Sequence, residues 1–245
     1  QIIAPAESAG KVWKWMAISD GILYALVGGE EYRDETLRGT RTDAGWTWAR
    51  LGAGYALPEY PWGFGRTFFA IDLETKRVLW VRTETESIDG RAVCMTDGRI
   101  YHYSPGNAVT CLDTKQGEVL WRNGDAELLQ AIGPSVRAQD NLNGYSSTCY
   151  VKCSDKAVYF AGPQRKRLAA VSAEDGQLLW QYPEGNFQLV LRREGLYALG
   201  TTHASKLFDP VTGDILQELP CRRTNCARAT GTVDSIFYRG EGPTL

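Results

Sequence analysis

Short apolar stretches alternate with polar turns along this 245-residue chain. Four segments share one pattern: an apolar strand that ends at Asp or Ser, three variable residues, a Gly, and a return strand that ends in Leu-Trp. The Asp or Ser side chain accepts hydrogen bonds from backbone N–H groups further along the turn, and Gly supplies positive φ at its end. Each segment therefore predicts a β-hairpin. The four are AIDLETKRVLW (70–80), CLDTKQGEVLW (111–121), AVSAEDGQLLW (170–180) and LFDPVTGDILQ (207–217).

Each position of the pattern has one exception. Lys76 stands in the Gly position of the first hairpin, Ser172 in the Asp position of the third, and Gln217 in the Trp position of the fourth. Recurrence at hairpin spacing predicts structural roles, in turns for the aspartates and in packing for the tryptophans. These structural repeat residues are Asp72, Trp80, Asp113, Trp121, Trp180 and Asp209.

A turn followed by a β-rich strand with a tyrosine precedes each hairpin, as in TDGRIYHY (96–103). Another short apolar stretch lies before that turn. The repeating unit is therefore four antiparallel strands, the content of one propeller blade. We expect a single all-β propeller segment over 1–245. Its four complete blades and partial fifth are about 11–80, 87–121, 146–180, 186–217 and 226–245.

The first blade contains an insertion at residues 29–66, which is rich in aromatic and charged residues. Long loops within a compact repeat are usually functional or disordered. Aromatic side chains beside charges suit carbohydrate stacking or a protein interface, and the alternative is a local core that packs on the propeller. The candidate binding surface is Trp46, Trp48, Tyr55, Tyr60, Trp62 and Arg66.

The D-x-x-x-G-x-x-L-W hairpins make residues 11–240 resemble the PQQ-like (quinoprotein dehydrogenase-type) β-propeller repeat family. The resemblance implies that the repeated Trp docks between neighbouring blades and that a ring has about eight blades. The chain would then be a segment of a larger ring, completed by the remainder of the parent protein or by another chain. The family contains both dehydrogenases and non-catalytic scaffolds, so the repeat indicates a fold more than a function.

Dehydrogenases of this family hold pyrroloquinoline quinone and Ca²⁺, often with two adjacent cysteines under the quinone. This sequence contains no Cys-Cys pair, and turn formation accounts for the repeated aspartates. We therefore expect no cofactor, no catalytic residue and no metal site, with His102 and His203 as ordinary strand or loop residues. The first alternative is a fragment of a dehydrogenase dependent on the quinone and Ca²⁺. The second is a propeller that binds or degrades carbohydrate.

The net charge of −2 gives no basic surface for nucleic acid. The run QRKRL (164–168) is short, and we expect it in a solvated loop. No stretch of about 18 apolar residues predicts a membrane span. Six cysteines favour an oxidising compartment, periplasmic or extracellular, where Cys221 and Cys226 could close a small disulfide loop. The sequence thus predicts a secreted or periplasmic non-catalytic scaffold that binds a protein or another ligand.

Overall fold

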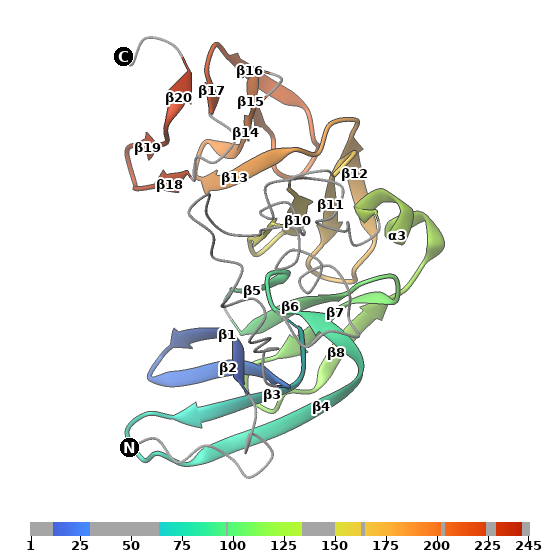
Figure 1. Cartoon of the computed structure of the whole chain (residues 1–245), viewed down its shortest axis with the longest axis vertical. Helices are drawn as coiled ribbons and strands as arrows, with labels where there is room; N and C mark the ends of the chain where they lie inside the picture. Colours follow the sequence, from blue (N-terminus) through green and yellow to red (C-terminus); the bar gives the residue numbers. More distant parts are fainter. Residues whose placement is uncertain are drawn as a thin grey trace, which may run out of the picture. The chain divides into compact units, whose positions relative to one another are not determined.

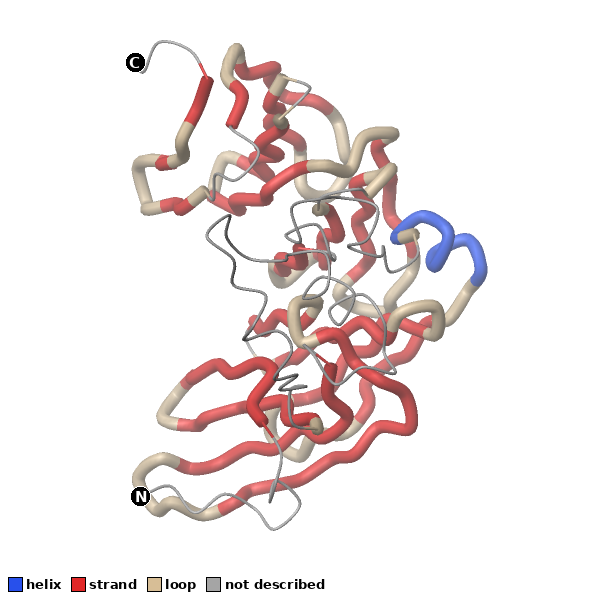
Figure 2. The backbone as a smooth tube through the Cα atoms, viewed as in Figure 1, coloured by secondary structure: helices blue, strands red, loops and turns tan. Residues whose placement is uncertain are grey.

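The protein consists mainly of short antiparallel strands, with one helix in the described part, α3 (Ala126–Ile132) (Figure 2). The chain divides into two compact units, residues 1–124 with 135–148, and residues 125–134 with 149–245. We describe each unit by itself. The computed structural model describes residues 12–29, 64–96, 98–133, 150–162, 165–201, 204–223 and 229–241.

The first unit contains two four-stranded sheets, blade 1 and blade 2, and in each the strands lie in chain order (Figure 1). All neighbouring strands pair antiparallel. Blade 1 comprises β1 (Val12–Ser19), β2 (Ile22–Gly28), β3 (Phe64–Asp72) and β4 (Val78–Asp89). Blade 2 comprises β5 (Val93–Thr96), β6 (Arg99–Ser104), β7 (Ala108–Asp113) and β8 (Val119–Asn123).

The second unit contains blade 3 and blade 4, with the same order and pairing. Four antiparallel sheets of four strands confirm the predicted all-β class and blade architecture. Blade 3 comprises β9 (Tyr150–Cys153), β10 (Ala157–Ala161), β11 (Leu168–Ser172) and β12 (Leu178–Tyr182). Blade 4 comprises β13 (Phe187–Arg192), β14 (Gly195–Gly200), β15 (Ser205–Phe208) and β16 (Ile215–Leu219).

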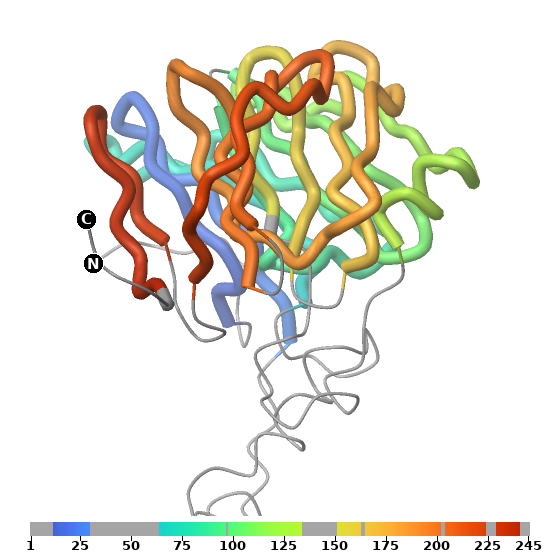
Figure 3. Tube along the Cα trace, turned by 90° about the horizontal axis from the view of Figure 1, so that it is seen from above, coloured from blue at the N-terminus to red at the C-terminus, as the bar shows by residue number. Residues whose placement is uncertain are grey.

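A two-stranded segment, residues 222–241, follows blade 4, and we call it the half-blade. Figure 3 traces it in red. Strand β18 (Thr230–Gly231) pairs with β19 (Ile236–Phe237), and β17 (Arg222–Arg223) pairs with β20 (Gly240–Glu241). Strands β17 and β18 together therefore correspond to the first strand of a blade, and β19 and β20 together to the second.

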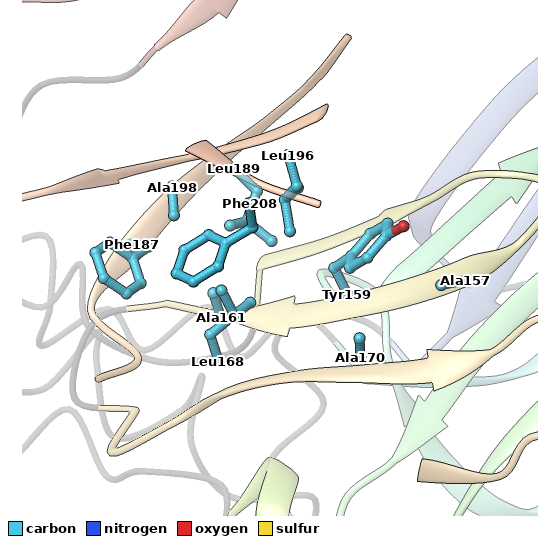
Figure 4. Packing of buried hydrophobic residues seen from close by; sticks show 10 residues of the cluster. All are labelled: Ala157, Tyr159, Ala161, Leu168, Ala170, Phe187, Leu189, Leu196, Ala198 and Phe208. Atoms are coloured by element: carbon cyan, nitrogen blue, oxygen red, sulfur yellow. The ribbon is translucent and has the colours of Figure 1, made fainter. Parts of the chain in front are cut away.

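The core lies between facing sheets. Between blades 3 and 4, Tyr159 of β10 and Ala170 of β11 face side chains of β13, β14 and β15 (Figure 4). Phe208 lies in the centre of this cluster, with Phe187 and Tyr159 in the same layer. A corresponding cluster joins blades 1 and 2, through Phe68 and Trp80 among others. The second strand of each blade is almost entirely buried, and it has a paired strand on both sides.

The expectation that the run at 164–168 lies in a solvated loop is wrong for Arg165. Its side chain is buried rather than solvated, and its guanidinium donates to the carbonyl oxygens of Ile132 and Gly133 at 2.9 and 2.8 Å. Helix C-termini leave carbonyl groups without intrahelical partners, and a cation there is favourable. Arg165 therefore fixes the end of α3 against blade 3, while its neighbours Lys166 and Arg167 are exposed.

Candidate functional site: the junctions between blades

The predicted binding surface falls mostly outside the described residues. Trp46, Trp48, Tyr55, Tyr60 and Trp62 all lie in the undescribed range, and Arg66 is the described member. Arg66 is on β3 with an exposed side chain, and its Nε donates to Ser87 Oγ at 3.4 Å. The binding surface stays a prediction.

The repeated acidic residues form hydrogen-bonded turns. Asp113 Oδ1 accepts from the backbone N–H groups of Lys115 and Gln116, both at 2.7 Å, and Oδ2 accepts from Glu118 N at 2.9 Å. Asp209 accepts from two backbone N–H groups in the same way, and these bonds lower the pKa of its carboxyl group. Asp72 makes the corresponding bond to Thr75 N at 2.7 Å, which lowers the pKa of Asp72.

Trp80 joins blade 1 to blade 2. Its indole Nε1 donates to the carbonyl oxygen of Thr114 at 2.9 Å, in the turn of blade 2. Its ring lies directly on Gly117, because a Cβ added to that glycine would lie 2.6 Å from Cε3 of the indole. The ring of Tyr24 lies 6.2 Å from that of Trp80, so a Tyr–Trp pair of blade 1 covers the turn of blade 2.

The second unit repeats this geometry. Trp180 Nε1 and the Tyr159 hydroxyl both donate to Pro210 O, at 3.3 and 3.0 Å, and a Cβ on Gly213 would lie 2.6 Å from the Trp180 ring. The rings of Tyr159 and Trp180 lie 6.3 Å apart at 43°. The Tyr101–Trp121 pair of blade 2 has nearly the same geometry, 6.0 Å and 41°. Each Trp in the repeat thus pairs with the Tyr of its own blade.

The leucine before the Trp position is not a core residue. In all four hairpins the pairing shifts by one residue at that point, which leaves the leucine in a β-bulge. A bulge bends an outer strand and disfavours pairing with another edge strand. The bulged side chains are 42 to 53% exposed, and they are Leu79, Leu120, Leu179 and Leu216.

Two of the exceptions in the repeat have clear structural consequences. Lys76 adopts the left-handed conformation, φ 59°, in the position where Gly117, Gly176 and Gly213 have φ between 72° and 79°. Gln217 is exposed, and it pairs with Leu207, where the three tryptophans pair with the smaller Ala70, Cys111 and Ala170. The blade 4 face that carries Gln217 therefore has no indole, and Arg192 lies 5.8 Å from the Tyr197 ring there.

A buried polar cluster between blades 1 and 2 was not expected from the sequence. Glu84 is almost fully buried and forms ion pairs with Arg82 and, at 3.5 Å, with Arg122. His102 is fully buried beside Phe68, and neither ring nitrogen has a hydrogen-bond partner. Burial first, and then the charges of Arg122 and Arg82, lower the pKa of His102 to about 3, so its ring is neutral. Strand alternation from Ile100 could have placed His102 on an inner face.

Possible metal ligands and cysteines are the next candidates among the described residues. No three of their His, Cys, Asp or Glu side chains gather as metal ligands would. Cys221 has a partly exposed thiol, and its predicted disulfide partner, Cys226, lies outside the described residues. Burial, and then a hydrogen bond with Cys221, raise the pKa of Tyr238 to about 12. No helix within the described ranges is long and apolar enough to cross a membrane.

Sheets of four meandering strands, joined by Tyr–Trp pairs that cover the next turn, define a β-propeller repeat protein. Residues 64–217 match the family model described as outer membrane protein assembly factor BamB, and the chain belongs to this family of PQQ-like propellers. No curated protein matches the sequence.

A solved structure shows the same fold. BamB from Moraxella catarrhalis is similar with a TM-score of 0.52 and 16% identity, covering 92% of this chain. The chain spans 57% of that BamB. The computationally designed Ika4 protein matches with a TM-score of 0.39 and 13% identity, over 65% of this chain and 94% of Ika4.

Proposed function

We propose that the chain is a non-catalytic propeller scaffold that binds protein partners, as a segment of a larger ring in the periplasm or outside the cell. The observation that carries the proposal is the use of the repeated polar groups. Trp80 Nε1, Trp180 Nε1 and the Tyr159 hydroxyl donate to carbonyl groups of the next blade, and the aspartates bond to their own turns. The most distinctive residues of the repeat therefore serve architecture.

Membership of the BamB family supports the proposal, since that factor is described as acting in outer membrane protein assembly. The exposed bulge leucines also support it. Leu79 and Leu120, in one unit, are 47% and 50% exposed on outer strands, where a partner has access to them. Apolar side chains that become buried in an interface lose water on association, which favours binding.

The test is site-specific photo-crosslinking in the cell of origin. A photoreactive residue replaces Leu79, Leu120, Leu179 or Leu216 in turn, and exposed Thr75 of the blade 1 turn serves as the control position. We expect discrete protein adducts from the leucine positions and not from Thr75. Adducts that are equal at all positions, or none, would contradict the proposal.

Two alternatives predict other results. A dehydrogenase fragment would come from a parent protein that binds the quinone with Ca²⁺ stoichiometrically. Titration of the full-length parent protein, followed by absorbance, would detect this binding. A carbohydrate-binding propeller would bind glycans on a glycan array. The double variant Trp46→Ala and Trp48→Ala would lose that binding. If that variant only lowers the melting temperature, the aromatic insertion is a local core.

A further inference from the structure

The outer edge of the junction between blades 3 and 4 exposes apolar side chains next to a tryptophan. Val211 is 48% exposed, in the turn where the Pro210 carbonyl oxygen accepts the hydrogen bond from Trp180. Ile215 and Leu216 follow on β16 and are 44% and 53% exposed. Trp180 is itself partly exposed. We call Trp180, Val211, Ile215 and Leu216 the 3–4 rim.

Strand pairing places Ile215 on the side of blade 4 that faces Trp180. Ile215 lies directly opposite Phe208, so these two side chains share one face of the sheet. The Phe208 ring stacks on the Trp180 indole of blade 3, with ring centroids 5.8 Å apart and ring planes at 22°. Ile215 and the indole therefore border the same junction, from opposite blades.

The junction of blades 1 and 2 shows how the same place can be closed. There Arg82, two residues after Trp80, donates to the glycine carbonyl of the blade 2 turn at 3.3 Å, and Trp80 is buried. Blade 3 has Tyr182 in the position of Arg82. The Tyr182 ring packs inward, with its centroid 5.1 Å from that of Phe208. No guanidinium therefore crosses the outer edge of Trp180 from this position.

The charges beside the 3–4 rim are acidic. Residues 178–184 and 210–219, which include the outer strands of both blades, contain Glu184, Asp214 and Glu218 but no Lys or Arg. Asp214 is exposed and immediately precedes Ile215. Glu218 forms an ion pair with Lys206 at 3.1 Å, yet its side chain is 67% exposed. Charge complementarity therefore favours a basic partner at this rim.

We propose that the 3–4 rim binds an extended segment of a partner protein in which apolar side chains alternate with lysine or arginine. An apolar side chain of this segment packs on Trp180 and Ile215, and a neighbouring cation lies beside Asp214. Tryptophan is among the residues that contribute most to binding when an interface buries them. This inference rests on the propeller scaffold proposed above, and it gives the chemistry of the segment that one junction binds.

The test uses a short, fluorescently labelled peptide of alternating leucine and lysine that contains one photoreactive leucine. A second peptide has glutamate in place of every lysine. By fluorescence anisotropy, the whole chain should bind the lysine peptide about tenfold or more tightly than the glutamate peptide at low salt. High salt should reduce this difference, because it screens exposed charges. Photo-adducts of the lysine peptide should map to residues 178–184 or 210–219.

Matched variants separate this junction from the equivalent one. Ile215→Ser and Asp214→Asn should each weaken binding of the lysine peptide by about threefold or more. Val119→Ser and Glu118→Gln change the equivalent positions of the blade 2 hairpin, and both should leave the affinity within about twofold. All four residues are exposed, so each variant should fold, and urea unfolding verifies this.

Equal affinity for the two peptides, adducts elsewhere in the chain, or equal losses in the control variants would overturn the inference. Self-association of the chain that Ile215→Ser abolishes would also overturn it, because a second copy would then cover the rim. Discrete adducts from the bulge leucines in cells, without binding of the lysine peptide, would reject this partner chemistry and leave the scaffold proposal standing. The scaffold proposal fails instead when those cellular adducts are absent or uniform, so the two failures are distinguishable.

Discussion

The indole ring of Trp80 lies against the α-carbon of Gly117, on the turn of the neighbouring sheet. The fit leaves no space for a side chain, since a Cβ on Gly117 would come within 2.6 Å of the ring. The glycine of the repeat thus has two causes, its positive φ of 72° and the Trp of the preceding blade. These two causes can be separated by substitution.

Gly117→Ala should destabilise the first unit by about 2–4 kcal/mol, because it adds steric overlap with Trp80 to the strain of a left-handed alanine. Gly98→Ala is the matched control, since Gly98 has φ 73° and nothing within 4 Å of its added Cβ. It should cost only about 1 kcal/mol. Urea unfolding followed by tryptophan fluorescence measures both. Equal losses for the two variants would mean that Trp80 does not restrict the turn.

At the junction of blades 3 and 4, the Tyr159 hydroxyl and the Trp180 ring can be tested separately. Tyr159→Phe removes one hydrogen bond to Pro210 O and should cost about 1 kcal/mol. Trp180→Leu removes the indole N–H and much of a packed ring, and should cost about 2–4 kcal/mol.

Leu179→Ala is the control for this junction, because Leu179 is the exposed bulge residue next to Trp180. Its effect on the free energy of unfolding should stay within about 0.5 kcal/mol. Thermal or urea unfolding ranks the three variants. A loss for Leu179→Ala as large as that for Trp180→Leu would contradict the assignment of the leucine to the outer surface.

Local chemistry explains why the hairpins were predictable. An Asp such as Asp113 bonds to N–H groups two to five residues away, so the sequence around it contains the whole turn. The all-β class and the four-stranded sheets follow from recurrence of that turn with a strand Tyr before it. Information of this kind is short-range, and a single sequence carries it.

Features that depend on neighbouring sheets were not predictable. Leu79 resembles a core residue in the sequence, yet it is 47% exposed because the pairing shifts between Ala70 and Ile71. Two consecutive apolar residues before the Trp were the available signal, since strict alternation cannot bury both. Arg165 is buried through its contact with Ile132, more than 30 positions away in the sequence. His102 is buried against Phe68 of the facing blade.

Lys76→Gly should stabilise the first unit by about 0.5–1 kcal/mol. Lysine at φ 59° is strained, and glycine adopts this region freely, although it also gains entropy in the unfolded chain. Lys115→Gly, in the equivalent turn of blade 2 but outside the left-handed position, should instead destabilise. Urea unfolding of both variants measures whether the free energy of unfolding rises or falls in each. A loss of stability for Lys76→Gly would show that its side chain makes contacts that outweigh the strain.

Buried His102 should make the first unit sensitive to mild acid. Its pKa of about 3 in the folded protein lies below the value near 6.5 of an unfolded chain, so unfolding takes up a proton below pH 6.5. Stability is therefore fully present above pH 6.5 and is lost as the pH falls from 6.5 toward 3. Between pH 7 and pH 5 the free energy of unfolding should fall by about 2 kcal/mol from this group alone.

The variant His102→Leu isolates that contribution, because leucine can pack beside Phe68 and does not titrate. Its unfolding free energy should change little between pH 7 and pH 5, a range in which most carboxylates stay ionised. Thr110→Val is the matched control, since Thr110 is buried directly opposite His102 and does not titrate. Urea unfolding at the two pH values should give Thr110→Val the slope of the wild-type chain. If His102→Leu retains that slope as well, another group binds the proton, and the neutral His102 imidazole is not the cause of the acid sensitivity.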